Sequence, residues 1–380
     1  MPVTLEEEIF GLAVNPYTKA PEMVRRYTLT NSNQMSVSVL TLGAIIQSVR
    51  MPDAFQKVDD VCLGFDDIAS YISTRAAYFG GTLGRVANRV ANGEFMIGDK
   101  KIEVTKNFQN TFQLHGGFIG FDSVIWEVVR KSEDRLTFRH VSPDGDEGYP
   151  GKLTTLIHYW LDNQNRFGVI FEASTDKPTA VNLSNHAYFN LAGHAAGPKA
   201  LAEHTVEIIS EKIIDTDEAQ IPTGKFLPVD DTVFDLRLPV LMGDRLKQFE
   251  DRPIKGYDNC FVVNSDPDVK GINMVAKVLH PPSGRALLIW TNQPGVQFYT
   301  ANNLPDESRG DNPVIGKGCT HYVKHGSFCL ETEKYPDSMN HPEFPSVFLS
   351  PGEKYVHEVV YEFRVEESWK CCCDTKNINK

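Results

Sequence analysis

The sequence has few cysteines, and they are not spaced for disulfide bonds or for zinc. The 380 residues include 7 cysteines, an odd number, with no Cys-x-x-Cys pair, and a chain of this length needs no disulfide staples. We therefore interpret them as reduced thiols and expect a cytosolic protein. Cys371–Cys373 lie near the end of the chain, where a solvated, poorly ordered tail is favoured over a palmitoylation or metal site.

The sequence also lacks a basic, apolar leader and a long hydrophobic run. Its first residues, MPVTLEEEIFG, are acidic where a signal peptide would be basic and then apolar. No apolar run approaches the length of a membrane span, so we expect no membrane association. An excess of positive charge is missing too, since the formal net charge is −12. This balance disfavours nucleic acid as a partner and suits a neutral small molecule.

Long helical patterns are scarce, whereas alternating patterns of period two are common. Turn-forming residues separate segments that are rich in β-branched and aromatic side chains. Short helices are expected only at Asp67–Phe79 and Met242–Phe249. The composition predicts an all-β sandwich or barrel of many strands. The segments that indicate strands include Ser36–Val49, Lys152–Leu161, Arg166–Ser174, Arg285–Asn292 and Tyr355–Val365.

No linker rich in Ser, Gly or Pro and no repeat of fixed period divides the chain. Because all-β sandwiches often exceed the average domain length, we expect one domain over residues 1–365, followed by a tail at 366–380. Some segments carry more glycines and polar residues than strand packing needs, and loops on a β scaffold usually carry the chemistry. These segments are Gly80–Gly93, Gln113–Gly120, Asn182–Gly193, Gln293–Asn303 and Cys329–Asn340.

Two of these segments contain a histidine next to glycines or aromatic residues. His115 precedes two glycines, and His186 lies in SNHAYFNLAG among aromatic residues. Taken alone, each histidine is more often a packed ring than a chemical group. His321 and His325 have a spacing that resembles a metal-binding pair, but no third ligand is evident, so we expect no metal site.

An arginine and two amides add groups that suit hydroxyl ligands. Asn88 and Arg89 together offer several donors and one acceptor, a good match to vicinal hydroxyls. An arginine that bridges strand ends is an equal alternative. Gln297 lies between Val296 and Phe298, where an outward-facing strand amide is as good an interpretation as a ligand contact.

Two carboxylates stand next to apolar segments. Asp258 precedes an apolar strand and is either a turn former or a hydroxyl-binding group. Glu331 follows Phe328-Cys329-Leu330, and burial there would raise its pKa toward the range useful to a base. The alternative is an exposed acid paired with Lys334.

These groups point to a sugar site when they are taken as a set. The glycines of Phe79–Phe95 fit neither a dinucleotide-binding motif nor a P-loop, and no nucleophile motif accompanies them. Neutral polyols are bound by paired donors and acceptors, with an aromatic ring against the apolar face of the sugar. The composition of the loops suggests such a site.

Several of these segments resemble, in order, the motifs of one family, the aldose 1-epimerases, also called galactose mutarotases. They are GRVANRVANGEF, LHGG, NHAYFNLAG, YDNCFVV, QPGVQFYTAN and FCLETEKYPDSMNHPEFPSVFLSPGE, within roughly Arg25 to Arg364. Motifs in the right order are far more specific than any one of them. The resemblance implies a large antiparallel β-sandwich that binds a free monosaccharide in an open cleft without a cofactor. The extension from about Glu366 departs from the family pattern.

The resemblance also implies roles at matching positions. Glu331 corresponds to the general base, His186 to the general acid, and His115 to a histidine beside the ring oxygen and sugar hydroxyls. Tyr188 corresponds to an aromatic in the substrate-contacting segment. The residues that correspond to hydroxyl-binding groups are Asn88, Arg89, Asp258 and Gln297, of which Gln297 is the most variable position in the family.

The implied reaction needs one base and one acid. Interconversion of α and β anomers removes the proton of the C1 hydroxyl and protonates the ring oxygen, after which the ring opens, rotates about C1–C2 and recloses. Each positioned acid or base contributes on the order of 10²–10⁴ in rate. We expect Glu331 as a carboxylate and His186 as an imidazolium near neutral pH, because their attraction favours both charged forms.

Two other functions remain as alternatives. An epimerase for hexose 6-phosphates would need more Arg or Lys around the cleft than Arg89 alone. A sugar-binding protein without catalysis would not need both Glu331 and His186. The sequence leaves open the preferred aldose and the oligomeric state, a monomer or a weak dimer.

Overall fold

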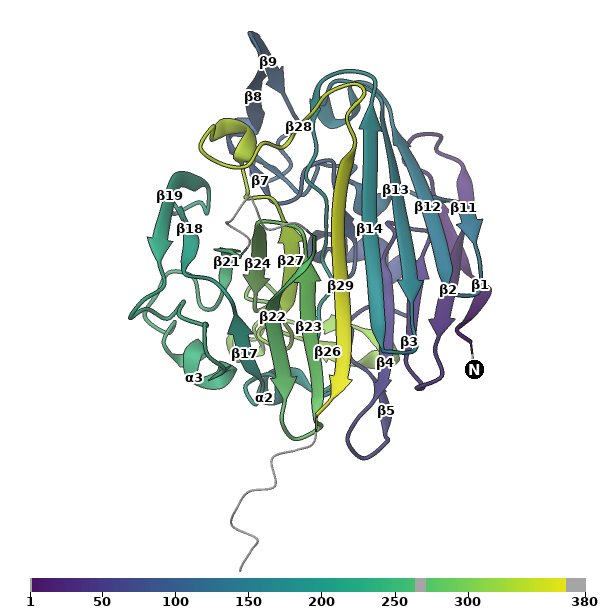
Figure 1. Ribbon diagram of the computed structural model, residues 1–380, viewed down its shortest axis with the longest axis vertical. Coiled ribbons are helices and arrows are strands. Elements are labelled where there is room, and N and C mark those ends of the chain that lie inside the picture. The colour runs from purple at the N-terminus through teal and green to yellow at the C-terminus, as the bar shows by residue number, and fades with distance from the viewer. Residues whose placement is uncertain (1, 264–270, 367–380) are drawn as a thin grey trace, which may run out of the picture.

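The computed structural model describes residues 2–263 and 271–366, and its framework is a nine-stranded antiparallel sheet (Figure 1). Strand β29, near the end of the described chain, lies between β14 and β23 and so joins the two halves of the sheet. In spatial order the strands are β11 (Glu127–Lys131), β12 (Arg135–Ser142), β13 (Leu153–Leu161), β14 (Arg166–Thr175), β29 (Tyr355–Val365), β23 (Arg285–Thr291), β22 (Asn273–His280), β17 (Thr205–Ile208) and β20 (Val240–Leu241).

Residue alternation along the central strands explains which face of this sheet is buried. Every second residue of β13, from Leu153 to Leu161, is buried, and the residues between them are half-buried. In β29 every second residue from Tyr355 to Phe363 is buried as well. Side chains of a strand alternate between its two faces, so this sheet has one apolar face that another layer must cover.

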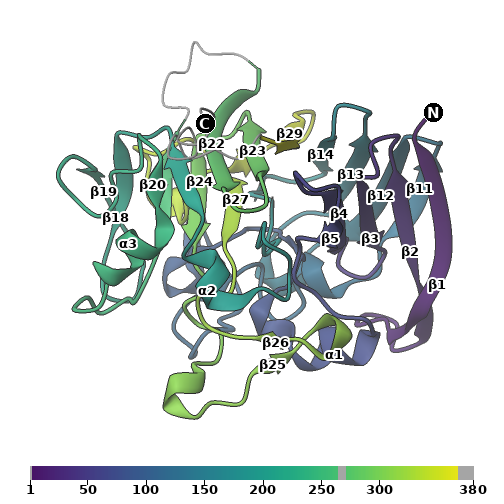
Figure 2. The same cartoon turned by 90° about the horizontal axis from the view of Figure 1, so that it is seen from below.

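Two five-stranded sheets provide that second layer (Figures 1 and 2). Buried side chains from all three sheets, including Val37, Ile157 and Phe298, form the largest hydrophobic cluster. The prediction of an all-β, antiparallel sandwich is therefore confirmed. One covering sheet contains β1 (Thr4–Val14), β2 (Pro21–Thr30), β3 (Ser36–Leu40), β4 (Ile46–Pro52) and β5 (Val58–Asp60), and the other β19 (Pro222–Pro228), β18 (Lys212–Thr216), β21 (Asp258–Val262), β24 (Gly295–Tyr299) and β27 (Cys329–Glu333).

The expectation of one strand over Ser36–Val49 is wrong, because the chain turns between β3 and β4. Gly43 and Ala44 have φ angles of 61° and 46° in this turn. A Cβ atom on Gly43 would lie 2.1 Å from the carbonyl oxygen of Asp122, so only glycine fits. The segment Gln293–Asn303, expected as a loop, contains the strand β24, and Cys329–Asn340 begins with β27, which continues past Glu331 to Glu333.

Helices are few and short, as expected. Helix α1 (Ile68–Ser73) and a 3₁₀ turn (Arg75–Ala77) occupy the first expected segment, and α3 (Met242–Lys247) the second. Asp67 caps α1 by accepting a hydrogen bond from the Ser70 backbone N–H. Helix α2 (Gly197–Leu201) was not expected. No helix in the described ranges is long and apolar enough to cross a membrane.

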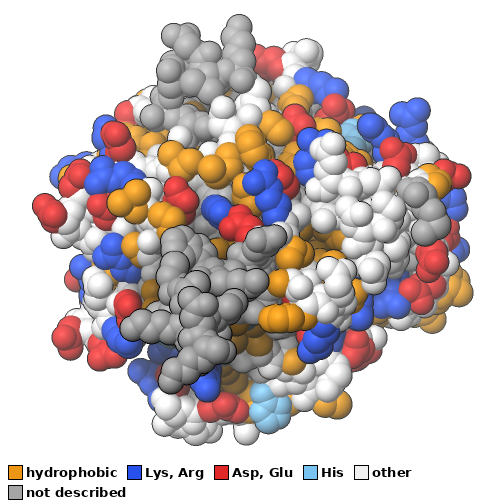
Figure 3. Space-filling view, turned by 60° about the horizontal axis from the view of Figure 1, so that its bottom comes forward, with side chains coloured by type: hydrophobic (Ala, Val, Ile, Leu, Met, Phe, Trp, Pro, Cys, Tyr) orange, Lys and Arg blue, Asp and Glu red, His pale blue; other side chains and the backbone are white. Residues whose placement is uncertain are grey.

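On the face shown in Figure 3, Lys and Arg side chains are interspersed with Asp and Glu. Cys62, Cys260 and Cys329 are buried thiols and Cys319 is an exposed one. The prediction for Cys371–Cys373 lies outside the described residues.

Short strand pairs and 3₁₀ turns connect the sheets. The short pairs are β6 (Thr82–Leu83) with β16 (Ser184–Asn185), β7 (Arg89–Val90) with β10 (Gln113–Leu114), β8 (Glu94–Ile97) with β9 (Lys100–Glu103), β15 (Thr179–Ala180) with β28 (Phe348–Leu349) and β25 (Val314–Ile315) with β26 (His321–Tyr322).

Candidate active site

A cavity of about 610 Å³ lies over the sheet that contains β21, β24 and β27. Its volume is in the range of small-ligand sites, roughly 300–1,000 Å³. Every residue that the sequence analysis assigns to a sugar site lines this cavity, although the residues come from segments far apart in the chain. They are Asn88, Arg89, His115, His186, Tyr188, Asp258, Gln297 and Glu331.

Strand register brings three of these side chains onto one face of the covering sheet. Gln297 on β24 pairs with Glu331 on β27 and with Cys260 on β21, so their side chains share a face. Asp258 lies two residues before Cys260, on the same face of β21. The Gln297 Nε2 atom donates a 2.7 Å hydrogen bond to Asp258 Oδ1.

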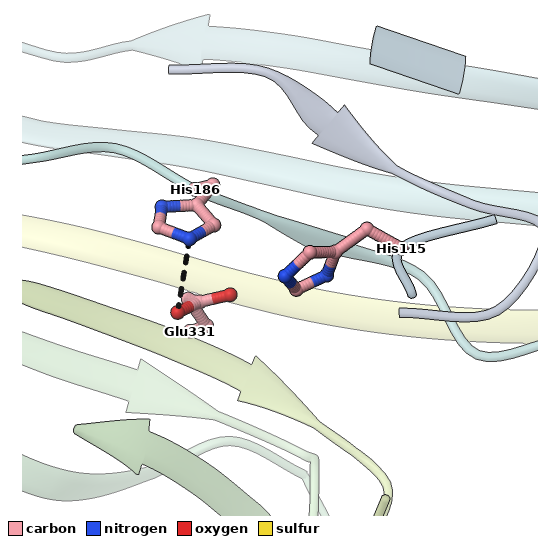
Figure 4. Close-up of side chains that lie close together, drawn as sticks. All are labelled: His115, His186 and Glu331. Atoms are coloured by element: carbon pink, nitrogen blue, oxygen red, sulfur yellow. Dashed lines mark ion pairs between the residues drawn. The ribbon is translucent and has the colours of Figure 1, made fainter. Parts of the chain in front are cut away.

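Glu331 is a buried carboxyl group with unused hydrogen-bonding capacity. The residue is 2% exposed, and its Oε2 atom has no hydrogen-bond partner in the described chain. Its Oε1 atom lies 3.7 Å from His186 Nε2 (Figure 4). The alternative pairing with Lys334 does not form, because Lys334 Nζ donates to the Ser346 carbonyl oxygen.

Backbone pairing and an aromatic stack hold His186 in place. The chain leaves β16 at His186, whose N–H donates to the Gly81 carbonyl oxygen at 2.9 Å. The His186 ring stacks on Tyr188 at a centroid distance of 4.8 Å and an interplanar angle of 21°. The Tyr188 hydroxyl donates to the Ala77 carbonyl oxygen at 2.9 Å, which fixes the tyrosine behind the histidine.

The expected charge state of the His186–Glu331 pair is wrong for the free site. Burial lowers the pKa of His186 to about 4, so this imidazole is neutral near neutral pH. Burial, with the nearby carboxyls of Glu333 and Asp258, raises the pKa of Glu331 well above its usual range. At 3.7 Å the two groups are too far apart for a hydrogen bond that would offset burial. Both shifts favour the uncharged forms of the two groups.

His115 is a neutral histidine of defined tautomer. Its Nδ1 atom accepts a 3.1 Å hydrogen bond from the backbone N–H of Asn88, so Nε2 carries the proton and acts as a donor. Burial lowers the His115 pKa well below its usual value. His115, His186 and Glu331 have ligand atoms within 4.8 Å of one another, but this tautomer leaves His115 Nε2 without a lone pair for a metal. A protonated nitrogen suits a sugar oxygen better.

Arg89 belongs to a network of amides and carboxylates at the cavity wall. Its Nη1 atom donates to Asn88 Oδ1 at 3.1 Å and its Nη2 atom to Gln220 Oε1 at 2.7 Å. Gln220 Nε2 in turn donates to Asp258 Oδ2 at 2.7 Å. The buried Arg89 Nε has no partner in the described chain. The network holds donors and acceptors where hydroxyl groups could bind.

Some cavity residues escaped the sequence analysis. Gln220 follows Asp217-Glu218-Ala219 in an ordinary turn, and only its position in space marks it. Tyr78 packs its ring edge-on against His115 at a centroid distance of 4.7 Å. The sequence analysis also missed Glu333, which does not line the cavity but lies two residues after Glu331 on the same buried face of β27.

The geometry supports proton transfer on a neutral polyol. Across the His186–Glu331 gap an acid and a base face one cavity, and His115 adds a neutral donor. Arg89 is the only Lys or Arg among the described residues that line the cavity. The arrangement fits a ligand with many hydroxyls better than one with a phosphate group.

Comparison with known proteins shows the family to which this sequence is similar. The family model described as aldose 1-epimerase matches residues 25–362. A galactose mutarotase of Mus musculus is 41% identical over 334 residues, which cover 88% of this chain and 92% of that protein. An aldose 1-epimerase of Escherichia coli (strain K12) is 34% identical over 346 residues, 90% of this chain and 96% of that protein.

Solved structures of similar fold include an aldose epimerase homologue and a galactose 1-epimerase. The crystal structure of an aldose epimerase homologue from C. elegans superimposes with a TM-score of 0.80 at 29% sequence identity, and the match covers 89% of this chain and 98% of that chain. A galactose 1-epimerase structure from Lactobacillus acidophilus NCFM gives a TM-score of 0.78 at 24% identity and covers 96% and 100% of the two chains. The second match shows the likeness of fold.

Proposed function

The chain belongs to the aldose 1-epimerase family, and we propose that it interconverts the α and β anomers of free hexoses such as galactose and glucose. The observation that carries this proposal is the His186–Glu331 pair, with 3.7 Å between Nε2 and Oε1, inside a cavity lined by hydroxyl-binding groups. The enzyme is an isomerase. The reaction needs proton transfer at two oxygens of one sugar, and these two groups supply it.

Substrate binding prepares the pair for ring opening. The buried Cys329 thiol lies 3.5 Å from His186 Nδ1; a proton on Nδ1 directed at this sulfur leaves the Nε2 lone pair facing Glu331. Sugar hydroxyls that donate to Glu331 stabilise its carboxylate form. The proton that Glu331 holds in the free site then passes to His186, which yields the carboxylate base and the imidazolium acid.

Ring opening and closure use the pair in opposite directions. Glu331 removes the proton of the C1 hydroxyl while His186 Nε2 protonates the ring oxygen, which breaks the C1–O5 bond and forms the open aldehyde. After rotation about C1–C2, His186 takes back the proton of the O5 hydroxyl. Glu331 returns its proton to the aldehyde oxygen as the ring closes on the other face. The enzyme is thereby restored.

The other site residues bind the sugar. His115 Nε2–H donates to a sugar oxygen, because its tautomer is set by the Asn88 N–H. Arg89, Asn88, Asp258 and Gln297 exchange hydrogen bonds with hydroxyls, and Tyr188 supports His186 from behind. We also propose a cytosolic location, which the free thiols Cys62, Cys260 and Cys329 support.

Polarimetry tests the proposed function. Freshly dissolved α-D-galactose or α-D-glucose should relax to the anomeric equilibrium faster in the presence of the purified protein. An unchanged rate at high enzyme concentration would rule out the activity. Strong competition by glucose 6-phosphate would favour a hexose-6-phosphate epimerase, a reaction for which the cavity offers only Arg89.

Substitution of Glu331 should have the largest effect on catalysis. Glu331→Gln keeps the shape of the side chain and removes the base, so kcat should fall by about 10²–10⁴. His186→Asn should cause a loss of similar size, and the circular dichroism spectra of both variants should match the unaltered protein. Full activity in the folded Gln variant would contradict the assignment of the base.

A further inference from the structure

β27 carries a second buried carboxyl group that the proposed reaction does not use. Glu333 lies two residues after Glu331 on one strand, so both side chains are on the same face. Glu333 is 0% exposed. Its Oε1 atom accepts a 3.1 Å hydrogen bond from Asn88 Nδ2, and its Oε2 atom is buried without a partner in the described chain. Burial of an acid with so little hydrogen-bond compensation lowers the stability of the fold.

Asn88 connects Glu333 to the sugar-binding wall. With Nδ2 directed at Glu333, the other end of the amide, Oδ1, accepts from Arg89 Nη1 at 3.1 Å. The backbone N–H of Asn88 sets the tautomer of His115. The acceptor that Glu333 provides therefore fixes the orientation of the Asn88 side-chain amide, which accepts from Arg89, while the backbone N–H of the same residue contacts His115.

Glu333 faces several other titratable groups, and most of them are acidic. The opposite residue on β24 is Gly295, which brings no charge. Burial raises the pKa of Glu333 to about 8 even though the Asn88 hydrogen bond and the charge of Arg89 lower it. The groups that face it are Glu331 on the same strand, Asp258 and Cys260 on β21, Arg89 beside Asn88, and Tyr355 at the start of β29.

We propose that Glu333 is a positioning residue that keeps the shared proton on the Glu331–His186 pair and orients Asn88. The inference rests on the proposed epimerase function. Ring opening needs one proton on the pair, since a pair without a proton has a base but no acid. Because the His186 pKa is about 4, Glu331 must hold that proton, and burial already raises the pKa of Glu331. Once Glu333 ionises, at a pH of about 8, its negative charge raises the pH at which the last proton leaves the pair.

The pH dependence of kcat/KM in Glu333→Gln tests this role. The Gln side chain keeps an acceptor for Asn88 but cannot ionise. We expect the alkaline limb of the profile to move to lower pH by about one unit or more, with the acid limb in place because Glu333 is uncharged there. KM for galactose at about pH 6 should stay within about twofold.

Two further variants separate charge from shape. Glu333→Asp keeps an ionisable group and should hold the alkaline limb near its original position. Glu333→Leu removes the acceptor too, so its KM should rise by about tenfold in addition to the shift of the limb. The matched control is Glu8→Gln on β1, where Glu8 pairs with Arg26 at the protein surface; its pH profile should not move.

Each outcome decides the inference. An unmoved alkaline limb in active Glu333→Gln would overturn it, and so would an equal shift in Glu8→Gln. Infrared titration of the buried protonated carboxyl bands gives a readout without activity. Glu333→Gln should lose one titrating carboxyl and lower the midpoint of another, and unchanged bands would also overturn the inference. If the unaltered protein accelerates no mutarotation, the proposed function fails, while the infrared titration still tests the coupling of the two carboxyls.

Discussion

Arg85 and Arg89 are two buried arginines four residues apart, in the duplicated stretch RVANRVAN, yet their surroundings differ completely. Arg85 is 2% exposed and its guanidinium donates five hydrogen bonds, to Ser142, Pro143, Pro150 and Thr179. Arg89 is 9% exposed and its guanidinium donates two, both to amide side chains of the cavity wall. A guanidinium has five donors, so the protein uses all of those of Arg85 but only part of those of Arg89, whose Nη2 also lies 3.9 Å from Asp258 Oδ2 at the cavity wall.

The same distinction separates two buried histidines. His357 Nδ1 donates to the Leu183 carbonyl oxygen at 3.1 Å, and its Nε2 accepts from the Thr332 hydroxyl at 2.8 Å. His186 has only the Cys329 sulfur near Nδ1, and its Nε2 faces Glu331 across the cavity. Groups whose bonding capacity is used within the protein stabilise the fold, whereas those with unused capacity are available for chemistry.

Replacement of Arg85 should lower the stability more than any of the other substitutions. A small effect would contradict the distinction between Arg85 and Arg89. Arg85→Met leaves three buried carbonyl oxygens without their donor, so we expect a loss of about 4 kcal/mol in the free energy of unfolding. Urea denaturation measures this loss. The folded fraction should keep its kcat, since Arg85 does not line the cavity. Arg89→Met is the matched control and should cost less than about 1 kcal/mol of stability.

Acid should destabilise the fold through its buried histidines, because burial keeps them neutral. Burial lowers the pKa of His357 to about 3, whereas the unfolded chain has a histidine pKa of about 6.5. Between these values the unfolded state binds more protons, so stability is lost as the pH falls below about 6.5. His357 alone should account for about 2 kcal/mol between pH ~7 and pH ~5.

The variant His357→Gln isolates that contribution. Urea denaturation at both pH values should show a smaller acid loss in the variant than in the unaltered protein, by about 2 kcal/mol. His186→Asn should reduce the acid loss by a similar amount, because burial lowers the pKa of His186 to about 4. An identical acid loss with and without His357 would show that its ring is not held neutral in the fold.

Replacement of Arg89 by lysine should have the smallest effect, a moderate rise in KM without a large loss of stability. This result would separate the role of Arg89 in binding from the structural role of Arg85. Arg89→Lys keeps the charge but loses the planar fork that contacts Asn88 and Gln220, so KM for galactose should rise by about tenfold. Steady-state polarimetry measures it. The free energy of unfolding should stay within about 1 kcal/mol of the original value. A large loss of stability with unchanged KM would mean that Arg89 is structural.

Much of the fold could be predicted from local patterns. The period-two alternation of Lys152–Leu161 and Tyr355–Val365 led directly to β13 and β29, because a strand alone determines which side chains share a face. The turn at Gly43 was missed, because what requires glycine there is the backbone of Asp122, distant in sequence. Local patterns do not predict the full extent of β24 and β27, because their polar side chains line a cavity rather than face solvent.

The sequence by itself determined the inventory of the site and the order of its motifs, since Glu331, His186 and His115 could be named from their neighbours in the chain. Only the tertiary structure decided how Arg85 and Arg89 differ in their hydrogen bonds, in which direction the pKa values of His186 and Glu331 shift, and that Glu333 is buried on the same face as Glu331. Burial and bond saturation arise from contacts between distant residues: Asn88 and Glu333 are 245 positions apart, and Arg85 meets its partners 57 to 94 positions away. Desolvation by such contacts sets the pKa values, and no local pattern encodes it.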